Sequence, residues 1–127
     1  MRQLICLLSF LTFCTMTTFA QSDNDHVRHV VVFKYKADAS EADIQEVTDS
    51  FRDLQNKIPG IVSFEHGINN SPEGLNKGFT HVYLLTFENA EARDTYLPHP
   101  NHKEFGNLLS ELGVLEEVFV VDYTVGE

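Results

Sequence analysis

The chain of 127 residues contains little sulfur and no tryptophan. Its two cysteines, Cys6 and Cys14, and both of its methionines lie within residues 1–16. The rest of the sequence holds no thiol, which excludes disulfide bonds and cysteine catalysis there. A domain built from that part must therefore be held together by its hydrophobic core alone.

Basic residues are also scarce. Of the 9 lysines and arginines, Arg2 lies near the start of the chain, which leaves 8 against 19 acidic residues and a net charge of −11 for the remainder. A negative field of this size repels phosphate backbones and anionic lipid head groups. We therefore expect neither nucleic acid nor a membrane surface as a partner.

The only long hydrophobic run is Leu4–Cys14, which is shorter than the roughly 20 residues that a membrane-spanning helix needs. Arg2 precedes this run, and Thr18–Ala20 follows it with the small-x-small pattern of a signal-peptidase site. The pattern predicts a signal peptide over residues 1–20, cleaved after Ala20. The mature protein is then secreted or periplasmic, with no membrane attachment after cleavage.

A second interpretation is a lipoprotein anchored through Cys14, but Phe13 stands where such a site needs a small residue. Residues 21–26 are polar, and we expect them to be flexible. The domain itself is predicted over residues 27–125.

Periodicity within this domain predicts seven elements. Runs of β-branched and aromatic residues, whose side chains alternate between two faces, indicate strands over 27–36, 61–67, 80–88 and 117–124. Apolar residues at helical spacing indicate helices over 41–58, 90–97 and 100–112. This order is typical of a ferredoxin-like α+β fold, an antiparallel sheet with the helices on one face.

The predicted strands carry apolar side chains on both faces, although helices on one side cover only one of them. An exposed sheet face rich in valine, leucine and phenylalanine would form a large sticky patch. A second copy of the chain is the simplest cover. We therefore predict a homodimer in which two sheets face each other and form a dimeric α+β barrel.

The segment Tyr96–Phe105 has the highest density of proton-handling groups. Its two prolines exclude one continuous helix, so it predicts a helix end, an elbow capped by His99, and a new helix that begins at Pro100. A neutral imidazole, with an ordinary pKa of ~6.5, at His102 could abstract a proton while the Tyr96 hydroxyl orients the group that loses it. The alternative is that His102 only packs and forms hydrogen bonds.

The histidines His29 and His99 also allow more than one interpretation. His29 lies in a strand, where it is either a core histidine with satisfied hydrogen bonds or a pocket residue. His99 and His102 have a spacing that suits two metal ligands, but no third ligand lies nearby and no cysteine is available. We therefore expect no metal and no cofactor.

Several short motifs together resemble the stress-responsive dimeric α/β-barrel (Dabb) family. They are His29–Lys34, Ile58–Gly60, Gly78–His81, Thr86–Glu88, Tyr96–His102, Phe105 and Val121–Tyr123. The resemblance implies a dimeric α+β barrel with a pocket between sheet and helices in each subunit. The chain is similar to a plant polyketide cyclase of this family, which implies cofactor-free chemistry with His29, Tyr96 and His102 in the active site. A further pocket tyrosine of that enzyme falls at Phe51, which has no hydroxyl.

The first hypothesis is an exported homodimer that binds a small apolar molecule bearing a carbonyl group. Its pocket is expected to be bounded by His29, Phe51, Tyr83, Leu85, Tyr96, His102 and Phe105. If it is an enzyme, we expect a cyclase, isomerase or lyase step with His102 as the base, while Tyr96 and His29 position the substrate. Two alternatives stay open: a non-catalytic, stress-related binding or structural dimer, and a monooxygenase-like ferredoxin-fold barrel protein, for which a Soret band after incubation with haem is the test.

Overall fold

The computed structural model describes residues 25–126, so the predicted signal peptide and residues 21–24 lie outside the described residues. Seven elements follow in the predicted order. They are β1 (Val27–Tyr35), α1 (Glu41–Lys57), β2 (Ile61–Ile68), β3 (His81–Phe87), α2 (Ala90–Tyr96), α3 (Pro100–Leu112) and β4 (Leu115–Thr124).

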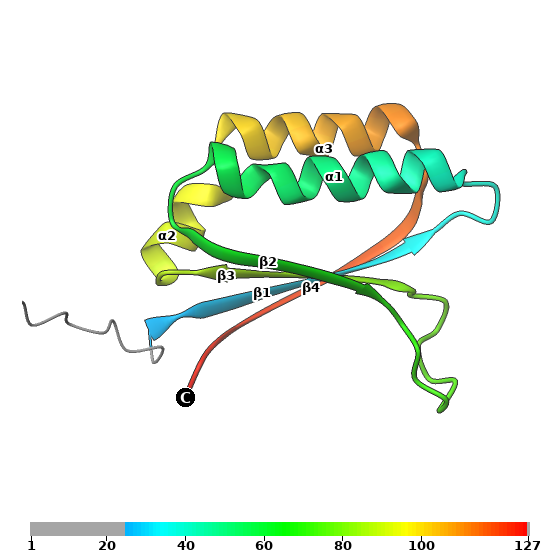
Figure 1. The fold of residues 1–127 in the computed structure, drawn as a ribbon, viewed down its shortest axis with the longest axis horizontal. Helices are drawn as coiled ribbons and strands as arrows, with labels where there is room; N and C mark the ends of the chain where they lie inside the picture. Colours follow the sequence, from blue (N-terminus) through cyan, green and yellow to red (C-terminus); the bar gives the residue numbers. More distant parts are fainter. Residues whose placement is uncertain (1–24, 127) are drawn as a thin grey trace, which may run out of the picture.

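The four strands form one antiparallel sheet in the order β2-β3-β1-β4. Helices α1 and α3 lie side by side over one face of the sheet, and α2 closes one end (Figure 1). This architecture confirms the predicted ferredoxin-like α+β fold. Within the part of the chain that the structure describes, no helix is long and apolar enough to cross a membrane.

Local side-chain chemistry sets the ends of the helices. The Ser40 hydroxyl accepts a hydrogen bond from the Asp43 amide at 3.1 Å, which caps α1. The predicted cap at His99 is confirmed: its Nδ1 accepts from the Asn101 amide at 3.2 Å, and Pro100 follows at the first helical position. Gly113 ends α3 with a left-handed φ of 60°, a conformation that glycine adopts without strain.

Most strand boundaries lie within one residue of the prediction, but the start of β4 does not. Strand β4 begins at Leu115, two residues before the predicted start at residue 117, because Leu115 pairs with Tyr35 after an irregularity in β1. Glu116 forms an ion pair with Lys34 across the two strands, with the nitrogen 2.7 Å from the oxygen. Two consecutive glutamates break the apolar alternation that identifies a strand, so the sequence pattern misses this start.

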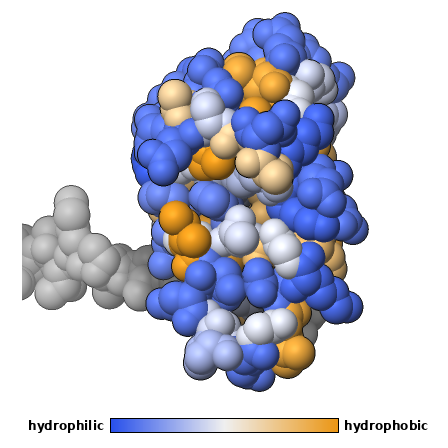
Figure 2. Space-filling model, turned by 90° about the vertical axis from the view of Figure 1, so that its right-hand side faces the viewer, coloured by the Kyte–Doolittle hydropathy of each residue, from blue (hydrophilic) through white to orange (hydrophobic). Residues whose placement is uncertain are grey.

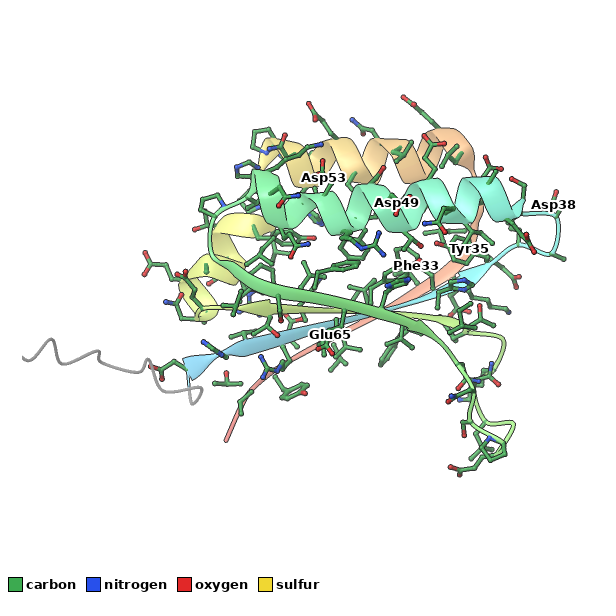
Figure 3. All side chains as sticks on the ribbon, in the orientation of Figure 1. Phe33, Tyr35, Asp38, Asp49, Asp53 and Glu65 are labelled. Carbon is green, nitrogen blue, oxygen red and sulfur yellow. The ribbon has the colours of Figure 1, made fainter. Side chains whose placement is uncertain are left out.

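The core lies between the sheet and the helices and is built largely from aromatic rings. Phe33 packs against Tyr83 with ring centroids 5.1 Å apart, and Phe51 stacks on Phe105 at 4.6 Å. Figure 3 shows Phe33 and Tyr35 on the helix side of the sheet, whereas Glu65 points away from the helices. This arrangement follows the alternation of side chains along each strand.

The other face of the sheet is apolar and uncovered. Its residues Val82, Phe119, Val121 and Tyr123 are 36% to 53% exposed, which is high for large hydrophobic side chains. By contrast, the end of the molecule at which α1 begins is largely hydrophilic (Figure 2). The outer sheet face is therefore the surface that is best suited to contact another molecule.

Candidate functional site

A cavity of about 240 Å³ opens where α3 passes over β1 and β4. It is lined by His29, Val31, Phe33, Phe51, Leu97, His102, Phe105, Gly106, Leu109, Val118 and Val120. None of these lining residues is Asp, Glu, Lys or Arg, so the two imidazoles are the only strongly polar side chains of the wall. The cavity is therefore suited to an apolar molecule with one or two polar atoms.

His102 is held at the start of α3 by the elbow that precedes it. Its Nδ1 lies 2.9 Å from the Leu97 carbonyl oxygen. A carbonyl can only accept a hydrogen bond, so Nδ1 carries the proton and donates. When the ring is neutral, its Nε2 lone pair is therefore free to accept a proton or a hydrogen bond.

His29 is held in the same way from the sheet. Its side chain is buried in β1, and Nδ1 lies 2.6 Å from the Asp122 carboxylate, at the position directly opposite in β4. The carboxylate of Asp122 also accepts a hydrogen bond from the Arg93 guanidinium, at 2.5 Å. His29 thus donates through Nδ1 and keeps Nε2 as the free ring nitrogen.

Tyr96 contacts the rings of both histidines. Its ring centroid is 4.3 Å from that of His102 and 5.9 Å from that of His29. The side chain is 0% exposed, and its hydroxyl has no hydrogen-bond partner among the described residues. Burial raises the pKa of Tyr96, so the phenol stays protonated and remains a hydrogen-bond donor.

The residues predicted from sequence divide into two groups. His29, Tyr96 and His102 come together at one end of the sheet, and Phe51 and Phe105 belong to the wall of the adjoining cavity.

The other two predicted residues, Tyr83 and Leu85, are fully buried core side chains that are absent from the cavity wall, as Tyr96 also is; unlike Tyr96, Tyr83 packs its ring against neither His29 nor His102. The Tyr83 hydroxyl instead forms hydrogen bonds with Thr48 at 2.9 Å and with Tyr35 at 3.0 Å.

Two polar residues beside the site, Asp122 and Arg93, were not predicted as part of it. Asp122 is the only charged residue between Val118 and Tyr123, and a lone acid within an apolar strand is a usable sequence signal. Arg93 carries no such signal, because an arginine on a short helix is ordinary. Its role is visible only from the 2.5 Å contact with Asp122.

A separate cavity of about 430 Å³ lies near the start of α1 and includes His66 and His81 in its wall. Burial lowers the pKa of His81, and the nearby His66 adds to this effect. Within residues 25–126, no group of three or more His, Cys, Asp or Glu side chains could hold a metal ion. The arrangement around Tyr96 therefore remains the best candidate for chemistry.

Comparison with known proteins points to one family. The sequence model of the Stress responsive A/B Barrel Domain family matches residues 27–125. The chain is 37% identical to the stress-response A/B barrel domain-containing protein HS1 of Arabidopsis thaliana, over 76% of this chain and 87% of that protein. It is 31% identical to olivetolic acid cyclase of Cannabis sativa, over 77% of this chain and 95% of the cyclase.

Solved structures resemble the chain over a similar span. A hydroxynitrile lyase from Passiflora edulis aligns with a TM-score of 0.73 and 27% identity, covering 82% of this chain and 96% of the lyase. A protein of unknown function from Jannaschia sp. CCS1, described as dimeric and ferredoxin-like, aligns with a TM-score of 0.67 and 26% identity. That alignment covers 79% of this chain and 99% of the other.

Proposed function

Because this chain belongs to the stress-responsive A/B barrel domain family, we propose that it is a homodimer whose subunits each bind a small, largely apolar carbonyl compound. The binding site is the cavity between α3 and the sheet. Its volume is about 240 Å³. An apolar cavity of about 150 Å³ is large enough to bind benzene, so this cavity can hold a slightly larger molecule. The expected ligand is therefore a single ring, or a chain of similar size, with a short polar substituent.

The observation that carries this proposal is the buried Tyr96 hydroxyl. A buried polar group without a partner costs about 1–3 kcal/mol, so such groups in native proteins call for an explanation. A carbonyl oxygen would accept the hydrogen bond that no described residue accepts. Tyr96 is not in the wall of the cavity, but the two histidines whose rings it contacts are, so the carbonyl end of the ligand would extend past these rings to reach the hydroxyl.

We propose that the chemistry is cofactor-free proton transfer with His102 as the base, while Tyr96 and His29 position the substrate. Two relatives are named for a lyase and a cyclase reaction, the hydroxynitrile lyase and the olivetolic acid cyclase, and lyase and cyclase steps are among those expected from the sequence. In hydroxynitrile cleavage a base takes the hydroxyl proton, the bond between carbon and nitrile breaks, and cyanide leaves with the electron pair as the carbonyl forms. The free Nε2 of His102 is suited to that proton transfer.

The dimer is supported by the uncovered apolar face of the sheet, which carries Val82, Phe119, Val121 and Tyr123. It is also supported by the dimeric description of the Jannaschia protein. Export is supported by the sequence of residues 1–20 alone, so we propose a secreted or periplasmic location on that ground.

A second candidate function is a non-catalytic binding dimer. The observation that favours it is the phenyl ring of Phe51 in the cavity wall, where the resemblance to the plant cyclase places a tyrosine. Without that hydroxyl the cavity has one polar group fewer with which to hold a reacting substrate.

Turnover of a hydroxynitrile of a single-ring aldehyde, followed by the absorbance of the released aldehyde, tests the proposal. His102→Gln should reduce turnover by about 100-fold or more, the usual contribution of a general base. His66→Gln is the matched control, because His66 is exposed and is not in the wall of this cavity, and it should leave turnover unchanged. Aldehyde binding without turnover favours the non-catalytic dimer, and the absence of both overturns the proposal.

A further inference from the structure

The ligand cavity between α3 and the sheet is closed toward the centre of the sheet and open toward β4. On its inner side the wall is formed by Val31 and Phe33 of β1, which are 5% and 2% exposed. The residues directly opposite them in β4 are Val120 and Val118, which also line the cavity but are 49% and 51% exposed. Binding pockets commonly bury roughly 70–90% of a small ligand. A single copy of the chain therefore leaves one side of this cavity open to solvent.

Strand β4 is an edge of the sheet and is apolar on both faces. Val118 and Val120 face the helices, whereas Phe119 and Val121, which are 53% and 44% exposed, lie on the outer face. Exposed edge strands are normally protected from pairing by a lysine, a proline or a bulge. The stretch Val118–Val121 contains no charged residue and no proline, and its pairing with β1 has no register shift. It is therefore suited to contact with another chain on both faces and along its free edge.

The opposite edge of the sheet, β2, is the strand that fits beside β4. The two strands have similar lengths, 8 residues for β2 and 10 for β4. When two sheets face each other across a two-fold axis that runs along the strands, β4 of each copy lies next to β2 of the other. The two junctions close the sheets into a barrel and leave no free edge.

Gly67 on β2 gives an independent reason for contact at that edge. It lies inside the strand, its φ is not positive, and a Cβ atom there would meet nothing within 4 Å. Neither backbone conformation nor packing within residues 25–126 requires a glycine here, although a glycine weakens a strand and often marks the close approach of another backbone. Gly67 lines a hollow of about 430 Å³ together with Val82 and Leu84. The hollow has room for an apolar side chain of a second copy, such as the partner's Phe119.

We propose that β4 docks along β2 of a second copy, and that this partner subunit completes the ligand cavity beside Val118 and Val120. The contact is continuous with the outer sheet face that supports the homodimer. The inference rests on the proposed function, because it concerns the same cavity and the same dimer. It goes further in making ligand binding a property of the dimer, since the bound molecule is shielded by α3 and the sheet of one subunit and by β2 of the other.

Thiol labelling tests this inference without a ligand. The chain has only two cysteines, Cys6 and Cys14, so a cysteine introduced into the domain is a new and separate reporter. Val120→Cys reports the open side of the cavity, and Val121→Cys reports the outer sheet face. Each variant is treated with N-ethylmaleimide, and the modified peptides are quantified by mass spectrometry so that each cysteine is read separately.

Leu75→Cys is the matched control, because Leu75 is 74% exposed and lies outside the sheet. We expect Val120→Cys and Val121→Cys to react at least about 10-fold more slowly than Leu75→Cys, because a thiol covered by the partner reacts only when the dimer opens. Dilution that dissociates the dimer should speed both reactions.

The two reporters separate this inference from the proposed function. Protection of Val121→Cys together with a Val120→Cys that reacts as fast as Leu75→Cys overturns the inference and leaves the homodimer standing. Absence of protection at both positions overturns the inference and the homodimer together.

Gly67→Glu tests the choice of β2 as the covering strand. Gly67 is not in the wall of the ligand cavity, and its side-chain position is empty in a single copy. Burial of the added charge against the partner is unfavourable, so the substitution should restore fast labelling of Val120→Cys. Gln55→Glu adds the same charge at an exposed position of α1 and should leave the labelling slow. Slow labelling with Gly67→Glu would overturn the placement of β2 beside β4.

Discussion

Replacing Tyr96 with phenylalanine should stabilise the ligand-free protein, an unusual result for a fully buried side chain. The substitution removes one oxygen atom and keeps the ring that packs against His102 and Phe87. That oxygen has no hydrogen-bond partner among residues 25–126. Its removal therefore relieves a desolvation cost and breaks no hydrogen bond seen in the structure.

The size of the effect follows from two terms. Relief of an unsatisfied buried hydroxyl contributes about 1–3 kcal/mol. The lost van der Waals contacts of one atom cost about 0.5 kcal/mol, at 0.1–0.2 kcal/mol for each contact. The net gain in free energy of unfolding is then about 1 kcal/mol, which moves the urea midpoint upward by about 0.5 M for a typical m-value near 2 kcal/mol/M.

Urea unfolding at one fixed protein concentration measures this change, since the stability of the proposed dimer would depend on concentration. Tyr83→Phe is the matched control, because Tyr83 is equally buried but its hydroxyl has Thr48 and Tyr35 as partners. That variant should lose about 1–2 kcal/mol. Equal destabilisation of both variants would refute the reasoning, because it would mean that the Tyr96 hydroxyl is satisfied in the folded protein.

Two further predictions concern other parts of the molecule. The pKa of His81 is lowered by burial and then by His66, so the folded state binds fewer protons at this site than the unfolded chain. His81 therefore does not affect the free energy of unfolding above pH ~6.5, and it destabilises the folded state increasingly as the pH falls below that value. We expect His81→Gln to make the free energy of unfolding fall less steeply between pH ~6.5 and ~5. An unchanged slope would contradict this. On the outer sheet face, Val121→Lys should weaken dimerisation by about 100-fold or more in analytical ultracentrifugation, because burial of an unpaired charge costs several kcal/mol. Leu75→Lys, at an exposed apolar residue outside the sheet, is its control, and equal dimerisation of both variants would argue against the sheet face as the interface.

The sequence predicts the fold well because its local signals agree with one another. Ser40 caps α1 as expected, and helical spacing is uninterrupted up to the turn at Pro59. The order of elements then leaves few arrangements for the sheet. The family resemblance inferred from the motifs is confirmed by the match over residues 27–125.

The site was harder to predict because it depends on strand register and on backbone contacts. The sequence separates His29 from Asp122 by 93 positions, and only the register of β1 against β4 places them opposite each other. The Leu97 carbonyl that fixes the ring of His102 is a main-chain group without a sequence signal. Alternation assigns Tyr83 to the helix-facing side but does not show that it lies in the core, away from the cavity wall.

The most direct test of the central claim is carbon-13 NMR of a benzaldehyde labelled at its carbonyl carbon, added to the wild type and to Tyr96→Phe. We predict that the wild type gives a bound signal shifted downfield from that of the free aldehyde, because the Tyr96 hydroxyl donates to the carbonyl oxygen. In Tyr96→Phe the shift should be lost. The absence of a bound signal in the wild type, or an equal shift in both proteins, would contradict a carbonyl site at Tyr96.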